Sequence, residues 1–377
     1  MKLADIAYKL VILSIVDIVV KGEIEMPDCK QFYNNICKEI NRIDKLKDFE
    51  TIFSVKQGSE DENVNLTEKQ KFASNFYKVP IVNYKGHITG KPQANNTRYS
   101  EVIADELVSK GYIKTWLELQ PLRPNHFDTG HNHSENVDMN KLQITNRKEE
   151  ILAKLLFYQR EVNDLGYIFD YQTPLKATQS NSYGKIDLLG YNKDDKCYSV
   201  IELKYRPSCS DETLLRCLLE AYTYYKLFDL DQIQSAKEHK GITNLRALKG
   251  YKHTKNAELV ILFDEKSRAE DDGGENSNLM LRIDPADIDN AHYPSKTVES
   301  QHHKECQELL DSDKRNSLRI LCETILKQEP SLKQIRFAVL RVDSNSKKNH
   351  LENITGWDAK LDRFYRAKTL LTISSKG

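Results

Sequence analysis

Helical and strand periodicities alternate most clearly between residues 147 and 342. Apolar residues spaced three and four apart predict helices, and short apolar or alternating runs bounded by turn residues predict strands. The expected elements are a helix over 147–163, strands over 167–176, 183–191 and 197–205, a helix over 213–228, a strand over 258–263, a helix over 317–328 and a strand over 335–342. The central order is therefore α-β-β-β-α-β, which indicates an α/β fold with a mixed sheet flanked by helices.

The region before this core has a different pattern. Residues 1–80 show mainly helical periodicity, and the polar stretch 121–140 contains Pro, Gly, Asn and His but few large apolar side chains. We therefore expect a mainly helical N-terminal domain over 1–140, a second domain over 141–345 and a C-terminal extension over 346–377. The apolar run from Leu10 to Val20 is interrupted by Asp17 and is too short to span a bilayer, so no membrane association is expected.

Composition narrows the function only a little. Charged residues make up 30% of the 377 residues and the formal net charge is zero. A zero net charge does not exclude binding of nucleic acid, because a local cluster of Lys and Arg is sufficient for contacts with phosphate. The seven cysteines are scattered and contain no CxxC pair, as is typical of free thiols in a cytoplasmic protein. His126, His131 and His133 lie in a polar loop, but neither Cys residues nor a helical HxxxH pattern accompany them, so they predict no metal site.

The chemically informative residues lie on the two strands that a turn at 192–195 joins. Asp187 sits among apolar residues on the first strand, and Glu202 and Lys204 lie two apart on the second. Because side chains two apart share a face of a strand, Glu202 and Lys204 point the same way. A hairpin through this turn places Asp187 opposite residues 200–202, so two carboxylates and an ammonium converge on one surface.

Two carboxylates crowded together require a compensating cation. Like charges within about 4–6 Å raise each other's pKa, and a hard divalent ion with oxygen ligands relieves this repulsion. Mg²⁺ suits such a site, with Mn²⁺ able to replace it, because it takes one or two carboxylates together with water and substrate phosphate. The alternative is a solvent-facing cross-strand ion pair, which contributes about 0.2–1 kcal/mol and has no catalytic role.

The pattern Asp187…Glu202-Leu203-Lys204, on strands in this order, resembles the PD-(D/E)xK nuclease superfamily of restriction-endonuclease-like proteins. The resemblance covers roughly residues 146–263. It implies that Asp187, Glu202 and the main-chain carbonyl of Leu203 hold the metal and that Lys204 assists catalysis. Ile186 stands where the family has a Pro before the Asp.

Two helices supply further candidates. The resemblance implies a Glu on the preceding helix, where Glu149 and Glu150 compete; Glu149 is preferred because it shares a stripe with Leu152 and Leu156, although it also suits a helix cap with Asn146. Some members carry a Gln and a Tyr four apart on the following helix. Glu220 and Tyr224 stand there, with Glu in place of Gln, and an ion pair with Arg216 is the other interpretation of Glu220.

The expected function is Mg²⁺-dependent hydrolysis of DNA by an endonuclease, in a restriction or phage-defence setting if the N-terminal domain recognises the target. Cleavage of both strands would favour a homodimer. Two alternatives remain open: an RNA or DNA-repair nuclease, and a nucleic-acid-binding or regulatory module that has kept the fold without turnover.

Overall fold

The computed structural model describes residues 28–40, 66–84, 99–121, 148–175, 184–204, 213–235, 240–264, 316–342 and 365–375. The apolar run from Leu10 to Val20, residues 122–140 with their three histidines, and Asn146 lie outside these ranges.

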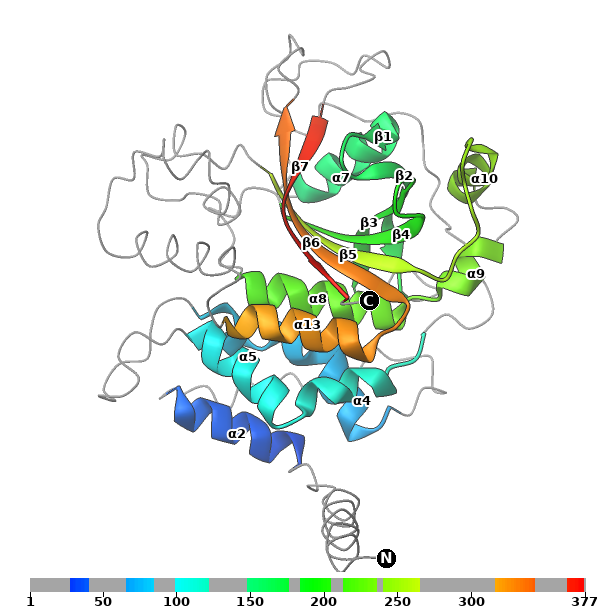
Figure 1. Ribbon diagram of the computed structural model, residues 1–377. Coiled ribbons are helices and arrows are strands. Elements are labelled where there is room, and N and C mark those ends of the chain that lie inside the picture. The colour runs from blue at the N-terminus through cyan, green and yellow to red at the C-terminus, as the bar shows by residue number, and fades with distance from the viewer. Residues whose placement is uncertain are drawn as a thin grey trace, which may run out of the picture.

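A seven-stranded mixed sheet forms the centre of the fold. Its strands follow one another in chain order. They are β1 Glu161–Val162, β2 Gly166–Pro174, β3 Lys185–Asn192, β4 Cys197–Lys204, β5 Ala257–Asp264, β6 Leu332–Val342 and β7 Tyr365–Ser374. Neighbours from β1 to β4 are antiparallel, β4, β5 and β6 run parallel, and β7 is antiparallel to β6. Figure 1 shows the sheet curling above a layer of helices.

Helices account for the rest of the described structure. Their bounds are α2 Cys29–Glu39, α4 Glu68–Asn75, η2 Phe76–Lys78, η3 Pro80–Asn83, α5 Tyr99–Ser109, η4 Tyr112–Glu118, α7 Lys148–Gln159, α8 Leu214–Leu227, α9 Leu230–Ser235, α10 Lys240–Ala247 and α13 Ser317–Gln328. None of the helices formed by the described residues has the length and apolar character needed to cross a bilayer. The predicted α/β class with a mixed sheet flanked by helices is confirmed. The predicted strands and helices follow one another in the expected order, but the two-residue strand β1 is added before β2, and α9 and α10 are inserted before β5.

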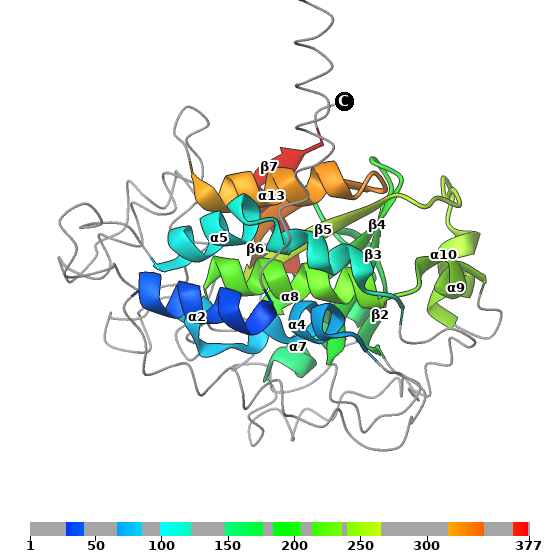
Figure 2. The same ribbon diagram turned by 90° about the horizontal axis from the view of Figure 1, so that it is seen from below.

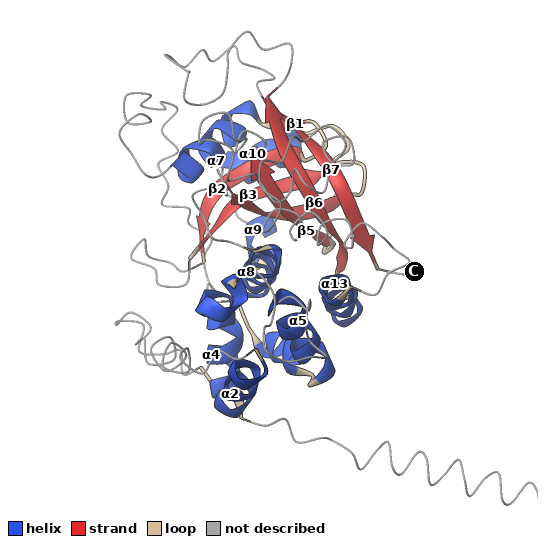
Figure 3. Ribbon diagram, turned by 90° about the vertical axis from the view of Figure 1, so that its left-hand side faces the viewer, coloured by secondary structure: helices blue, strands red, loops and turns tan. Residues whose placement is uncertain are grey.

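The two faces of the sheet pack against different helices. Alternate residues of β4, Tyr198 and Val200, belong to a large apolar cluster with α8 and α13, whereas Ile201 and Leu203 pack in a second cluster with α7. The period of two along a strand produces this separation. In Figure 3, α8 and α13 lie directly beneath the sheet and α7 lies on its other side.

The helices of the N-terminal part extend the layer that contains α8. Phe72 of α4 and Trp116 of η4 share the large apolar cluster with α8, and the Trp116 indole N–H donates to Oγ1 of Thr223 over 2.9 Å. The indole ring also stacks on Tyr222 at 6.2 Å between centroids. Figure 2, seen from the helical side, shows α2, α4 and α5 beside α8 and α13. The described residues of this region form only helices and their connections.

The largest differences from the predicted boundaries are at the end of the first predicted helix and in the C-terminal part. The helix expected over 147–163 ends at Gln159, because Arg160 takes a left-handed conformation (φ 63°) and the chain turns into β1. Within the stretch predicted as a C-terminal extension, Tyr365–Ser374 forms β7, which pairs with β6 along its whole length.

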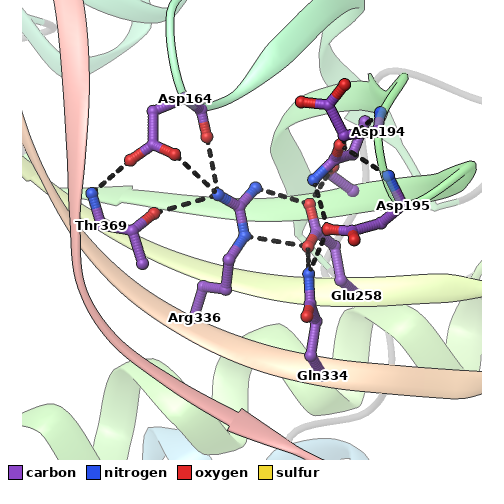
Figure 4. A network of polar contacts seen from close by, with 9 residues as sticks. Asp164, Asp194, Asp195, Glu258, Gln334, Arg336 and Thr369 are labelled. Carbon is purple, nitrogen blue, oxygen red and sulfur yellow. Dashed lines mark hydrogen bonds and ion pairs between the residues drawn. The ribbon is translucent and has the colours of Figure 1, made fainter.

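A buried ionic network around Arg336 and Glu258 connects several strands of the sheet (Figure 4). Arg336 of β6 donates to both carboxylate oxygens of Glu258 on β5, at 2.9 and 2.6 Å. Its remaining terminal nitrogen donates to the carbonyl oxygen of Asp164 and to Oγ1 of Thr369. Ser199 also donates to Glu258, so the network links the turn after β1 with β4, β5, β6 and β7. A cavity of about 760 Å³ borders it.

Candidate active site

The pairing of β3 with β4 brings the predicted carboxylates together. Leu188 pairs with Ile201 and Leu189 with Val200, so Asp187 and Glu202 follow opposite each other, as the turn at 192–195 predicted. Asp187 alternates with Leu189 and Tyr191, and Glu202 alternates with Val200 and Tyr198, all of which pack on the α8 face. Both carboxylates therefore lie on the same side of the sheet.

Lys204 stands between two carboxylates of this face. Its ammonium contacts Oε1 of Glu202 at hydrogen-bonding distance and lies 3.5 Å from Oε2 of Glu220 on α8. The Tyr224 hydroxyl, one turn further along α8, donates to Oε1 of Glu220 over 2.8 Å. The charge of Arg216 acts on Glu220, in keeping with the predicted ion pair, but the Glu220 carboxylate also lies 3.5 Å from the Lys204 ammonium of the site.

Asp187 is held by two hydrogen-bond donors. The amide N–H of Leu203 donates to its Oδ2 and the side-chain amide of Gln172 donates to its Oδ1, both over 2.9 Å. Gln172 lies on β2 with a left-handed backbone (φ 48°), a conformation that costs energy for a residue with a Cβ atom. The negative charge of Glu149 on α7 acts on Asp187 as well, so the preferred glutamate of that helix is a neighbour of the site.

The site contains more acidic than basic side chains, and these side chains are largely shielded from solvent. The exposed fractions of Asp187, Glu202 and Lys204 are 7%, 2% and 6%. Burial, followed by the charge of Glu149, raises the pKa of Asp187 well above its ordinary value; burial and the charge of Glu220 do the same for the pKa of Glu202. Burial alone would also raise the pKa of Glu220, but the charges of Lys204 and Arg216 outweigh it and lower that pKa.

These observations fit a hard divalent cation. Oε2 of Glu202 is buried and has no hydrogen-bond partner among the described residues, and burial together with neighbouring carboxylates raises the pKa of both Asp187 and Glu202. Asp187 and Glu202 would hold the ion, with the main chain of Leu203 beside them. No three His, Cys, Asp or Glu side chains in the described ranges are arranged to hold a metal by themselves. Two carboxylates completed by carbonyl and water oxygens are a usual set for Mg²⁺.

We expect Glu202→Gln to stabilise the metal-free protein. The Gln amide would donate toward Glu220, where the carboxylate oxygen now has no partner, and it would remove a buried charge, so the gain should be about 1–2 kcal/mol at neutral pH. When folding raises the pKa of a carboxyl group, the folded protein becomes less stable as the pH increases from about 4.3 toward that raised pKa. The advantage of the variant should therefore grow between pH 4 and pH 8.

Thermal unfolding in EDTA across this pH range measures the effect. Asp231→Asn, which removes an exposed carboxylate paired with Lys255, is the control and should change little. Addition of Mg²⁺ should stabilise the natural protein more than Glu202→Gln. A variant less stable than the natural protein at pH 7 in EDTA would contradict this account of Glu202.

Sequence reasoning found some residues of the site and missed others. Asp187, Glu202, Leu203 and Lys204 lie together as predicted, whereas Gln172 and Tyr77 had no signal in the sequence. Comparison of the chain with protein-family models, with curated proteins and with solved structures found no match.

Proposed function

We propose that this protein is a divalent-metal-dependent nuclease of the PD-(D/E)xK type that hydrolyses DNA phosphodiester bonds. The observation that carries the proposal is the convergence of Asp187, Glu202 and Lys204 on one face of the β3–β4 hairpin, with an excess of buried negative charge. A restriction-endonuclease-like core with a mainly helical recognition region, and a homodimer that cuts both strands, belong to the same proposal.

Each residue has a defined task in this scheme. Asp187 and Glu202 bind the ion, and Gln172 and the Leu203 amide orient the Asp187 carboxylate. When bound, Mg²⁺ would supply Lewis-acid polarisation of the scissile phosphate. Lys204 is placed to donate to a phosphate oxygen or to orient the attacking water. Hydrolysis adds the hydroxyl of that water to phosphorus and its hydrogen to the departing sugar oxygen.

The low exposure of the three central side chains favours a second candidate function, a nucleic-acid-binding or regulatory module without turnover. In that case the carboxylates and Lys204 would form a buried structural cluster, and the protein would bind nucleic acid without cutting it. Metal binding separates the two functions, because the structural cluster requires no cation at Asp187.

The test is cleavage of labelled duplex, branched and single-stranded DNA and of RNA, with Mg²⁺, with Mn²⁺ and with EDTA. We expect cleavage of DNA with either metal, no cleavage with EDTA, and calorimetric Mn²⁺ binding that Asp187→Ala removes. Preferential cleavage of RNA or of branched DNA would move the assignment to an RNA or repair nuclease. If the protein cleaves none of these substrates and binds no Mn²⁺, the nuclease proposal is wrong.

A further inference from the structure

A chain of hydroxyl groups runs from the N-terminal part of the protein to Lys204. The Tyr77 hydroxyl, on η2, lies 3.3 Å from the Tyr224 hydroxyl of α8. Tyr224 reaches Glu220 at 2.8 Å, and Glu220 lies 3.5 Å from the Lys204 ammonium. Tyr77, Tyr224 and Glu220 are 2%, 5% and 8% exposed, so water has little access to compete for these contacts.

The direction of the hydrogen bonds follows from the donors available. A tyrosine hydroxyl has one hydrogen, and Tyr224 donates it to the Glu220 carboxylate. Tyr77 must therefore donate to Tyr224. Burial raises the pKa of both tyrosines, so both hydroxyls keep their protons at working pH. Glu220 then accepts from Tyr224 on one oxygen and lies beside Lys204 on the other.

Tyr77 is positioned beside α8 by contacts of η3, the short helix that follows it in the chain. Thr213, the N-cap of α8, donates through its hydroxyl to the carbonyl oxygen of Val82 and through its amide to Oδ1 of Asn83. Tyr224 is confined from another side by Gly184, just before β3. A Cβ atom at Gly184 (φ 94°) would collide with the Tyr224 hydroxyl. The tyrosine pair is thus fixed between α8, η2 and the start of β3.

We infer that Tyr77 is a positioning residue for Lys204, acting through Tyr224 and Glu220, and that the N-terminal part completes the active site. This inference rests on the proposed function. Glu220 can hold the ammonium beside the metal-binding carboxylates only if its own orientation is fixed. The Tyr224 hydroxyl fixes that orientation, and the Tyr77 hydroxyl fixes Tyr224. The N-terminal region then contributes to the rate of the chemical step as well as to any recognition of a target.

Simple ring packing is the competing explanation. The two rings meet edge to face with centroids 5.8 Å apart, and this contact survives replacement by phenylalanine. Tyr77→Phe and Tyr224→Phe therefore remove only the hydroxyl groups. Tyr251→Phe is a matched control, because the Tyr251 hydroxyl lies 2.7 Å from that of Tyr198 in a second tyrosine pair, which packs against Tyr191.

The kinetics of DNA cleavage provide the first readout. We expect Tyr224→Phe to lower kcat about 10- to 100-fold, as for loss of a hydrogen bond to a charged group, and Tyr77→Phe about 3- to 10-fold. KM should stay unchanged in both, because neither hydroxyl is proposed to contact the substrate. The double variant should be no slower than Tyr224→Phe alone, since Tyr77 acts through Tyr224. Tyr251→Phe should retain the natural kcat.

A second readout needs no turnover. The side-chain ¹⁵N resonance of Lys204, assigned with Lys204→Arg, should shift in Tyr224→Phe and in Tyr77→Phe but not in Tyr251→Phe. An unchanged resonance and an unchanged kcat in Tyr77→Phe would overturn the positioning role. If no substrate is cleaved while the resonance still shifts, the hydroxyl chain acts on Lys204 and the nuclease proposal alone fails.

Discussion

Asp187→Ala and Glu202→Ala should each lower the rate of DNA cleavage by at least about a thousandfold, and Lys204→Ala by about a hundred- to a thousandfold. Loss of either carboxylate removes a proposed metal ligand, whereas Glu220 still lies 3.5 Å from the Lys204 ammonium. Loss of the ammonium keeps the ligands but removes the donor to the phosphate. Single-turnover cleavage at saturating Mg²⁺ measures the chemical step directly.

A second cluster, which joins α8 to the residue after α13, provides the control. Lys226 lies 2.7 Å from Oε1 of Glu329, and the Tyr222 hydroxyl donates to the same oxygen over 2.9 Å. This cluster has the same residue types as Lys204, Glu220 and Tyr224. The Lys226 side chain is 16% exposed and that of Lys204 is 8% exposed, so Lys226→Ala should cost less stability than Lys204→Ala, and it should leave the rate of cleavage within about twofold. Undiminished cleavage in all three site variants would exclude the assigned residues.

The hairpin that carries the site was predictable because local signals agreed. The apolar runs before and after Asn192–Asp195 have the period of strands, and Asn and Asp side chains favour a tight turn. The Asn192 side chain accepts from the amides of Asp194 and Asp195, which closes the turn as those residue types predict. The register then follows, and with it the opposition of Asp187 and Glu202.

The contributions from distant segments were not predictable. Gln172 reaches Asp187 only because its backbone adopts a left-handed conformation, for which neither Gly nor Asn marks the position. Tyr77 meets Tyr224 through the packing of η2 on α8, a contact across 147 positions of sequence. The apolar residues of β7 do not alternate regularly, because Leu370 and Leu371 are adjacent, so the strand is recognised by its pairing with β6. Tertiary packing decides each of these.

The largest effect on stability should come from breaking the Arg336–Glu258 pair (Figure 4). Arg336 is 4% exposed and Glu258 is fully buried, and the two make a bidentate contact between β6 and β5. Burial alone would lower the pKa of Arg336, but the Glu258 carboxylate outweighs burial and raises it. Removal of one partner leaves an uncompensated charge in the interior, so Arg336→Met or Glu258→Leu should each cost about 3–5 kcal/mol.

The double variant Arg336→Met with Glu258→Leu separates two effects on the free energy of unfolding. One is the cost of leaving a single charge buried without its partner, and the other is the net contribution of the intact ion pair. Because desolvation opposes the attraction between two buried charges, replacing both should recover much of the loss. Recovery should be incomplete, since Ser199 and Gln334 would lose an acceptor in Glu258. Urea unfolding of the two single variants and the double variant measures these differences.

The exposed pair Lys255 and Asp231 is the reference, and Lys255→Met should change stability by less than about 0.5 kcal/mol. Single variants as stable as this reference would show that the guanidinium and carboxylate are solvated, and the turn after β1 would then owe its position to backbone pairing with β2 and β7.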